Sequence, residues 1–241
     1  MKFDAFLSPT DSARARRTLA MIRRHTTSPF VLTGGLAIEA HLACRGIPVP
    51  LRRLNDVDFL VDSFEQIPPS LATELIFRHV HPCDPPGKTL LQCVHPETGV
   101  RVDIFRAYGG TTARAVPIGI HGANWRLISI EDLTARSARL CSDLASGATM
   151  PAKHTQDFLR LLPHANSARI QSVWIEHRKP NHPELFADAA NKLVDLIVAR
   201  SELQIDPVYS QDLNASCARC HSGGAFVLAD ARQVHSLLGY C

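Results

Sequence analysis

Three aspartates on two strand-like segments constrain this chain more than any other feature. Asp56 and Asp58 lie in the apolar run DVDFLV, and Asp103 lies in a second run, VRVDIF. Because side chains alternate along a strand, Asp56 and Asp58 leave one face while Val57 and Phe59 leave the other. Carboxylates held side by side repel one another unless a proton or a cation neutralises them. The pattern therefore predicts a site for two divalent metal ions.

A glycine turn precedes the first two aspartates. The short apolar run 30–32 ends at Thr33-Gly34-Gly35, and an amphipathic segment over 36–43 is expected as a helix. Backbone N–H groups at a helix N-terminus favour an anion, and glycine lets a phosphate approach closely. Gly-Gly alone is a weak signal of a phosphate-binding turn. The paired aspartates that follow it make the signal persuasive. We expect Thr33, Gly34 and Gly35 to bind the phosphates of a nucleotide.

A β-hairpin is expected to carry Asp103 to the strand of Asp56. The strand-like runs 89–94 and 100–105 flank the loop HPETG, which is long enough for an antiparallel turn. Alternation places Arg101 on the same face as Asp103. Two further strands are expected at 115–121 and 125–128.

Helices are expected on both sides of these strands. Ser129 and Asp132 have the spacing of a capping box, which predicts a helix start at about residue 130. The other helices are expected at 11–25 with Thr10 or Asp11 as its cap, 68–80, 152–162, and two pieces within 166–200 that break near 179–183. The helix at 130 is expected to end at about residue 145.

The first helix is basic, and the whole chain is mildly so. The segment DSARARRTLAMIRRH contains five arginines and a histidine, and the 241 residues carry a formal net charge of +3. A solvated helix face is the plain interpretation of such a charge run. The sharper hypothesis is a surface that attracts the phosphate backbone of RNA.

These motifs together resemble the nucleotidyltransferase superfamily that includes DNA polymerase beta. The likeness rests on Gly34-Gly35, the DVDF run at 56–59 and the VDI run at 102–104, and it covers about residues 28–162. It is closest to the AbiEii-type nucleotidyltransferases, many of which are toxins of toxin–antitoxin and phage-defence systems. The segments LISIEDL (127–133) and KHTQD (153–157) resemble later signatures of that family. Twenty residues separate Gly35 from Asp56, more than the family's usual spacing, and an Arg/Pro-rich insertion over 46–53 accounts for them.

The resemblance implies a nucleoside triphosphate (NTP) substrate and a two-Mg²⁺ site. Asp56 and Asp58 would hold the metals, and Asp103 would complete the second metal site and help activate the attacking hydroxyl. The remaining candidates for nucleotide binding are Arg53, Arg101, Lys153 and Asp157. Lys153 and Asp157 share one face of a helix, where a surface ion pair is the alternative interpretation.

Cysteine and histidine gather near the C-terminus in a second constellation. Cys217, Cys220, His235 and Cys241 have the spacing C-x2-C-x14-H-x5-C, which suits a structural, tetrahedral Zn²⁺ site. His221 competes with His235 as the fourth ligand. Cys217 to His221 also has the C-x-x-C-H pattern of c-type haem attachment, and free thiols are a third reading.

The fold class expected is α+β, a small mixed sheet flanked by helices as in nucleotidyltransferases. We expect a nucleotidyltransferase domain at 1–165, a helical segment at 166–205 and a zinc module at 206–241. No apolar run is long enough to cross a membrane and no signal sequence is recognisable, so a cytoplasmic protein is expected.

The sequence constrains the acceptor of the nucleotide less than any other part of the reaction. The resemblance implies transfer to RNA, with tRNA 3′ ends as acceptors for some relatives, and a cognate antitoxin as a partner. One alternative is transfer to a small molecule, as in antibiotic nucleotidyltransferases. Another is a protein that binds a nucleotide or a partner without turnover.

Overall fold

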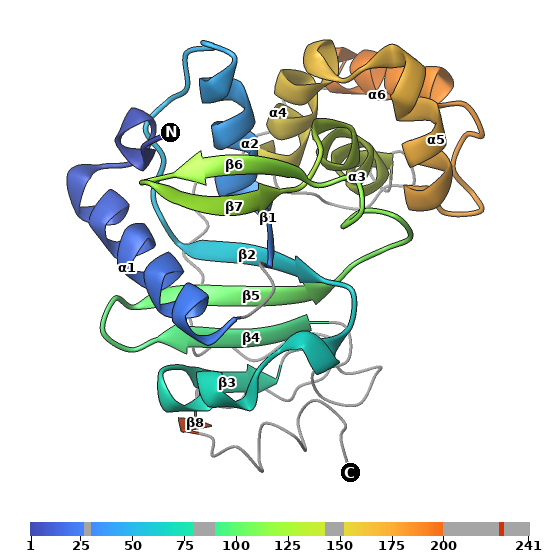
Figure 1. Ribbon diagram of the computed structural model, residues 1–241. Coiled ribbons are helices and arrows are strands. Elements are labelled where there is room, and N and C mark those ends of the chain that lie inside the picture. The colour runs from blue at the N-terminus through green and yellow to red at the C-terminus, as the bar shows by residue number, and fades with distance from the viewer. Residues whose placement is uncertain (27–29, 80–89, 143–151, 200–226, 229–241) are drawn as a thin grey trace. The chain divides into compact units, whose positions relative to one another are not determined.

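The structure, a computed structural model, contains a mixed β-sheet (Figure 1). Its strands follow the order β6-β7-β1-β2-β5-β4-β3-β8. β1 is antiparallel to β2 and parallel to β7, β2 is parallel to β5, and the other neighbours are antiparallel. The strands are β1 (Val31–Thr33), β2 (Asp56–Val61), β3 (Ile76–His79), β4 (Leu90–His95), β5 (Val100–Arg106), β6 (Val116–Ile120), β7 (Ala123–Leu127) and β8 (Val227–Leu228). The mixed sheet and its flanking helices confirm the expected α+β class.

The structure describes residues 1–26, 30–79, 90–142, 152–199 and 227–228. These residues divide into two units, one within Met1–Leu127 together with β8, and one within Ile128–Ser210. The division falls earlier in the chain than the expected domain boundary after residue 165. The expected zinc module at 206–241 lies outside the described residues, apart from β8.

The register of β2 and β5 brings the three aspartates together. Asp58 lies opposite Asp103, and Asp56 lies opposite Arg101 in this parallel pair. β4 and β5 form the expected hairpin around residues 95–100. Since side chains alternate, Asp56, Asp58, Arg101 and Asp103 leave one face of the sheet, which we call the carboxylate face.

The expected helix over 68–80 is wrong. A short 3₁₀ helix at Pro69–Thr73 is followed by strand β3 (Ile76–His79), which pairs with β4. The proline signals are right for the helix start, but Ile76 and Phe77 complete the sheet beside β4 instead of a second helical turn. Long-range pairing overrides local propensity here.

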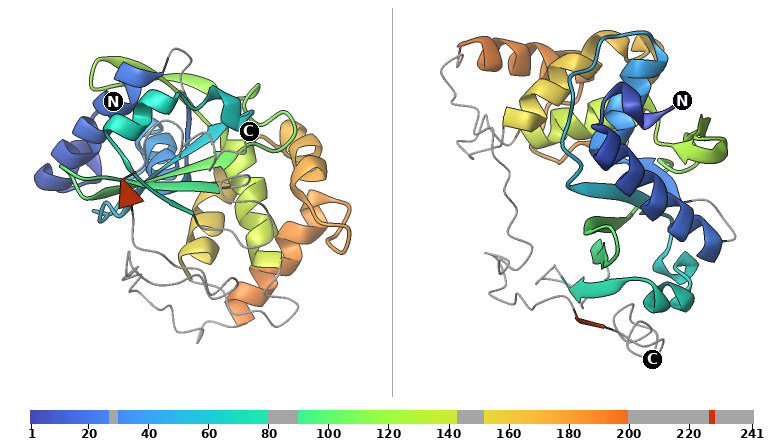
Figure 2. Two further views of the ribbon diagram at one scale, coloured as in Figure 1. Left: turned by 90° about the horizontal axis from the view of Figure 1, so that it is seen from below. Right: turned by 90° about the vertical axis from the view of Figure 1, so that its left-hand side faces the viewer.

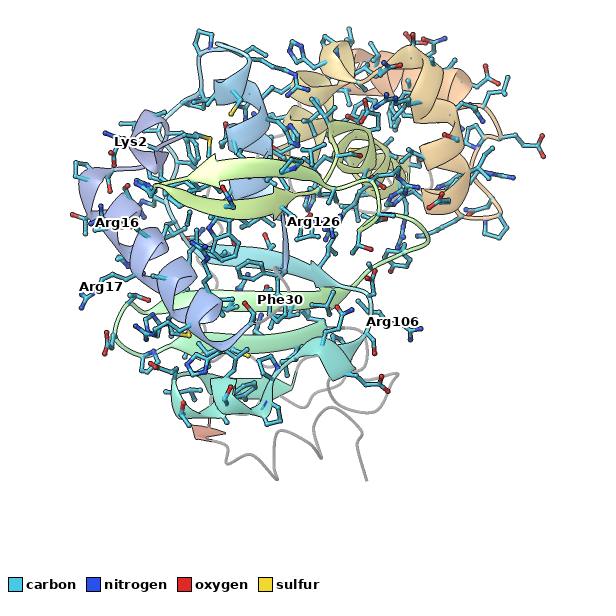
Figure 3. All side chains as sticks on the ribbon, viewed as in Figure 1. Lys2, Arg16, Arg17, Phe30, Arg106 and Arg126 are labelled. Atoms are coloured by element: carbon cyan, nitrogen blue, oxygen red, sulfur yellow. The ribbon has the colours of Figure 1, made fainter. Side chains whose placement is uncertain are left out.

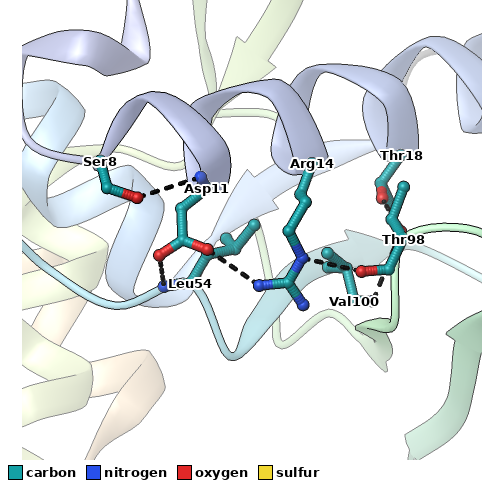
Figure 4. Close-up of polar contacts among 7 residues, drawn as sticks. All are labelled: Ser8, Asp11, Arg14, Thr18, Leu54, Thr98 and Val100. Atoms are coloured by element: carbon teal, nitrogen blue, oxygen red, sulfur yellow. Dashed lines mark hydrogen bonds and ion pairs between the residues drawn. The ribbon is translucent and has the colours of Figure 1, made fainter.

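Helix α1 (Pro9–His25) packs on the face of the sheet opposite the carboxylate face (Figure 1 and Figure 2). Its Thr18 contacts His95 of β4, which pairs with Val100 and therefore leaves the sheet on that opposite face. Its N-cap is Ser8, whose hydroxyl accepts a hydrogen bond from the Asp11 N–H, so the expected caps at Thr10 or Asp11 are wrong. Figure 4 shows how polar contacts fix the helix. Asp11 accepts from the Leu54 N–H at 3.2 Å, and Arg14 donates to the Thr98 carbonyl at 2.7 Å. α1 is thereby attached to the segments that lead into β2 and β5.

The described residues of the second unit include four α-helices. They are α3 (Ile130–Ser142), α4 (Ala152–Leu161), α5 (Ser167–His177) and α6 (Phe186–Ala199). The Ser129 hydroxyl accepts a hydrogen bond from the Asp132 N–H at 3.0 Å, which confirms one half of the expected capping box, and it donates to the Asp132 carboxylate at 2.6 Å. Asp132 also accepts from His177 at 2.9 Å, which joins α3 to α5. Trp174, fully buried, lies in the apolar core of this unit.

Candidate active site

The carboxylates of Asp56, Asp58 and Asp103 converge on the carboxylate face. One oxygen atom from each lies within 4.8 Å of the other two. Asp56 and Asp58 are half-buried and Asp103 is buried, so the cluster is open to solvent from the β2 side. Mg²⁺ takes carboxylate oxygens and keeps part of its water shell, and this donor set therefore fits a divalent hard cation.

Arg101 lies inside this cluster as its internal cation. Its Nε is 3.1 Å from both carboxylate oxygens of Asp103, and its Nη2 donates to Asp56. The side chain is buried, with 7% of its surface exposed. Three carboxylates and one guanidinium leave an excess of negative charge that a divalent cation can neutralise. Arg101 was expected to contact a triphosphate; the structure places it on the carboxylates instead.

Asp103 is the carboxylate most strongly affected by its surroundings. Burial raises its pKa from 3.8 to about 6, and the charge of Asp56 adds to the rise. Arg101 and a hydrogen bond from Gln92 on β4 oppose the shift by stabilising the carboxylate. Asp103 therefore exchanges its proton near neutral pH, which suits a group that binds a metal or accepts a proton.

Two consecutive glycines allow polar side chains to approach the start of helix α2 (Gly34–Cys44), into which β1 leads directly (Figure 1). Gly34 has a φ of +65°, and a Cβ there would lie 1.8 Å from Oδ2 of Asp58. A Cβ on Gly35 would lie 2.7 Å from the guanidinium of Arg52. Gly34 requires glycine, because its φ is positive and the Asp58 carboxylate occupies the space of a side chain, whereas a side chain at Gly35 would displace the guanidinium of Arg52.

Thr33 completes the turn between β1 and α2. It lies opposite Asp58 in the β1–β2 pair and is fully buried. Its hydroxyl has no hydrogen-bond partner among the described residues. An unpaired buried hydroxyl is costly, which is consistent with a ligand that completes its hydrogen bonding.

Arg52, not the expected Arg53, is the arginine beside this turn. Arg53 is exposed, whereas Arg52 is half-buried and forms a 2.9 Å ion pair with Glu39 of α2. Glu39 is itself buried, with 1% of its side chain exposed. The sequence could not distinguish the two neighbouring arginines, because the loop before β2 has no periodicity that assigns a face. Arg52 is thus a candidate phosphate ligand that sequence reasoning missed.

Lys153 and Asp157 lie in the second unit, on α4. Lys153 is exposed, and Asp157 is buried. Asp157 lies 3.9 Å from Arg160 on the same helix. Burial, together with the charge of Asp157, raises the pKa of the Cys141 thiol on α3 to about 12. Their expected role in nucleotide binding stays a prediction.

The expected zinc ligands Cys217, Cys220, His235 and Cys241 lie outside the described residues. The three cysteines resolved as free thiols in the described part are Cys44, Cys93 and Cys141. No helix among the described residues is long and apolar enough to cross a membrane.

Comparison with known proteins returns likeness only at the level of solved structures. No family model matches the chain, and no curated protein matches it. The antibiotic-resistance factor ANT(2'')-Ia aligns with 79% of this chain and 96% of its own, at 12% identity and a TM-score of 0.47. JHP933 from Helicobacter pylori covers 97% of this chain and 90% of its own, at 15% identity and a TM-score of 0.43.

A third structure is an antigenic nucleotidyltransferase-like protein from Paracoccidioides brasiliensis. It covers 82% of this chain and 92% of its own, at 18% identity and a TM-score of 0.41. At these values the likeness carries no weight for the activity of this chain.

Proposed function

We propose that the chain is a divalent-metal-dependent nucleotidyltransferase, which moves a nucleoside monophosphate from an NTP to an acceptor hydroxyl. The observation that carries the proposal is the convergence of three strand-borne carboxylates within 4.8 Å, beside a glycine-opened helix N-terminus. Metal-binding carboxylates supply oxygen ligands, and the helix N-terminus offers N–H groups to a phosphate. Nucleotidyl transfer needs metal binding and phosphate binding at the same site.

Asp56, Asp58 and Asp103 are the proposed metal ligands. Mg²⁺ bound there would stabilise the charge that develops on the α-phosphate and on the leaving pyrophosphate. Arg101 holds Asp56 and Asp103 in place through its hydrogen bonds. The carboxylates therefore do not have to find their arrangement when the substrate binds.

The start of α2 is the proposed triphosphate site. The backbone N–H groups of Gly34 and Gly35 at the helix N-terminus are the proposed donors to phosphate oxygens, and Arg52 supplies a positive charge next to Gly35. The Thr33 hydroxyl is available as a further donor. Arg53, Lys153 and Asp157 remain proposed nucleotide contacts.

The proposed reaction is an in-line displacement at the α-phosphorus. A bond forms between the acceptor oxygen and this phosphorus, and the bond to the β-phosphate oxygen breaks as pyrophosphate leaves. The proton of the acceptor hydroxyl passes to a carboxylate oxygen of Asp103, the buried acid of the cluster.

RNA is the proposed acceptor, with tRNA as its first candidate, and a toxin or phage-defence role of the AbiEii type follows from the sequence resemblance. A cognate antitoxin is the partner that this role would require. The basic surface of α1 supports an RNA acceptor, because clustered arginines attract a phosphate backbone. A small-molecule acceptor and a purely binding role are the alternatives.

A transfer assay tests the proposal. The purified protein is incubated with Mg²⁺, each labelled NTP in turn and total tRNA, next to Asp56→Asn and Asp58→Asn variants. Glu65→Gln is the matched control, because Glu65 is an exposed acid on a neighbouring 3₁₀ helix and lies outside the carboxylate cluster. Label should enter RNA with the wild type and the control, and fall by at least about a hundredfold in the aspartate variants.

The other outcomes identify the alternatives. Label that enters a small hydroxyl-bearing acceptor but not RNA would replace RNA by a small-molecule acceptor. Nucleotide binding without transfer to any acceptor, in the presence of Mg²⁺ or Mn²⁺, would leave a binding protein and refute the enzymatic proposal.

A structural Zn²⁺ site at Cys217, Cys220, His235 and Cys241 is a further part of the proposal. Its support is the ligand spacing alone. Metal analysis of the purified protein should give about one zinc per chain, reduced by Cys217→Ser and unaffected by Cys44→Ser, since Cys44 is an exposed thiol far from this motif in the sequence. Protein purified without zinc and fully folded would contradict it.

A further inference from the structure

A cavity of about 300 Å³ lies between helix α1 and the end of the β6–β7 hairpin. Figure 1 shows the turn of this hairpin beside α1. Leu19 of α1, Ile120 of β6 and Trp125 of β7 contribute apolar surface to it. The volume is in the range of sites that bind a small organic group.

Arginines from α1 surround the opening of this cavity. Arg16, Arg23 and Arg24 all line it, and no acidic residue is among its lining residues. Arg24 is paired with Glu74 at 3.1 Å. Arg16 and Arg23 are exposed and have no acidic partner among the described residues. The cavity therefore carries uncompensated positive charge.

The remaining arginines of α1 have other partners. Arg14 binds Asp11 and the Thr98 carbonyl, and Arg17 lies 3.7 Å from Glu97. Figure 3 labels Arg16 and Arg17, which leave α1 at successive positions; of the two, only Arg16 lines the cavity. The arginines of α1 are therefore not equivalent. Among the described residues, only Arg16 and Arg23 both line the cavity and lack an acidic partner.

The hairpin side of the cavity is held in a defined shape. His121 has a φ of +48° in the β6–β7 turn and accepts a hydrogen bond from the Phe3 N–H at 3.1 Å. Burial lowers the pKa of His121 and Arg16 lowers it further, while Asp4 opposes the shift. The positive charge of the site therefore comes from the arginines.

This cavity is separate from the carboxylate cluster. Trp125 packs on Phe59, with ring centroids 6.0 Å apart. Phe59 leaves β2 on the face opposite Asp56 and Asp58, because side chains alternate along the strand. A ligand in this cavity would occupy the α1 side of the sheet and leave the carboxylate face free.

We propose that this cavity binds one nucleotide of a single-stranded RNA segment, with its base against the apolar surface and its phosphates on Arg16 and Arg23. The two arginines are seven residues apart on one helix face, which corresponds to about 10 Å along the axis. This separation suits successive phosphates of a chain better than one phosphate of a free nucleotide. An unstacked base has an apolar face, and arginine binds phosphate through two parallel hydrogen bonds.

Binding of a fluorescent ten-nucleotide RNA by the full chain tests the proposal. Fluorescence anisotropy is measured with EDTA and without NTP, so that transfer plays no part. Arg16→Gln and Arg23→Gln should each weaken binding about tenfold. Arg17→Gln is the matched control, since it removes an equal charge from the next position of the same helix outside the cavity; its effect should stay below about twofold.

A variant without a charge change separates the cavity from general electrostatics. Ala20 is an exposed residue that lines the cavity, and Ala20→Phe would fill it. This variant should weaken binding about tenfold with an unchanged melting temperature and an unchanged slope of affinity against salt. Binding that survives Ala20→Phe, or an equal loss in Arg17→Gln, would overturn the proposal.

Competition identifies the ligand class. Unlabelled single-stranded RNA should displace the probe, whereas nucleoside monophosphates and duplex RNA of the same length should need at least about a hundredfold higher concentration. Equal competition by a monophosphate would make this a free-nucleotide site, and equal competition by duplex would make it a backbone-binding surface; either overturns the proposal. The site goes beyond the proposed transfer reaction. If the protein binds RNA through the cavity but transfers no nucleotide, only the proposed reaction is refuted. If it transfers a nucleotide to RNA without binding RNA at the cavity, only the proposed site is refuted.

Discussion

Substitution of Gly34 by alanine tests whether glycine is needed at this position to hold the Asp58 carboxylate in place. The Cβ would lie 1.8 Å from Oδ2 of Asp58, and real Cβ atoms are not found closer than 3.0 Å to such a neighbour. The carboxylate must therefore retreat by about 1.2 Å. A displacement of about 1 Å in a reacting constellation costs about a hundredfold in rate. We expect Gly34→Ala to lose about a hundredfold in transfer and to bind Mn²⁺ more weakly.

Gly46→Ala is the matched control for this experiment. Gly46 follows the C-terminal end of the same helix with a φ of +71°, close to the +65° of Gly34, but nothing lies within 4 Å of its Cβ position. Alanine in this left-handed region costs about 1–2 kcal/mol at either position. Both variants should lose this stability in urea unfolding, and Gly34→Ala should lose more because of the added contact.

The comparison of the two variants decides the outcome. Metal affinity is measured by the electron paramagnetic resonance signal of free Mn²⁺, and stability by the midpoint and slope of unfolding. Equal Mn²⁺ affinity in Gly34→Ala and Gly46→Ala would refute the reasoning, because Asp58 would then be free to move without consequence for the metal site.

Three further predictions concern buried charges. Arg101→Ala leaves Asp56 and Asp103 without their shared cation, so it should cost about 3–5 kcal/mol in urea unfolding; Mg²⁺ should restore more stability to this variant than to the wild type, and equal effects would contradict the role of Arg101. Because the pKa of Asp103 is raised to about 6, protons compete with the metal below that pH, and calorimetric titration should show Mg²⁺ affinity about tenfold lower at pH 5 than at pH 7; a flat profile would contradict it. His177→Ala removes a donor from the buried Asp132 carboxylate and should cost about 1–3 kcal/mol in urea unfolding, whereas a loss below about 0.5 kcal/mol would show that other groups compensate.

The three aspartates could be predicted from the sequence because their signal is local. Alternation within β2 and β5 assigns each carboxylate to a face, and the short loop between β4 and β5 predicts their hairpin. The parallel pairing of β2 with β5 then brings Asp58 opposite Asp103. The alternation and the hairpin need only the period of a strand and the length of a loop. The parallel pairing of β2 with β5 is a long-range feature that the fold supplies.

The partners of the arginines could not be predicted in the same way. Arg52 and Arg53 are neighbours in a loop without periodicity, and only the fold places Arg52 against Gly35. The sequence does place Arg101 on the face of Asp103, but an arginine near carboxylates is equally suited to bind phosphate. Its burial between two carboxylates depends on the approach of β2, which lies more than forty residues earlier in the chain.

The position of Arg101 on the same strand as Asp103 has a consequence for how the chain assembles. Strand β5 carries one positive and one negative side chain to the two aspartates of β2. Its docking therefore adds no net charge, although it brings a third carboxylate to the cluster. Strands β2 and β5 can therefore pair before any cation binds. Refolding in the presence of a chelator should yield a native chain that binds metal afterwards.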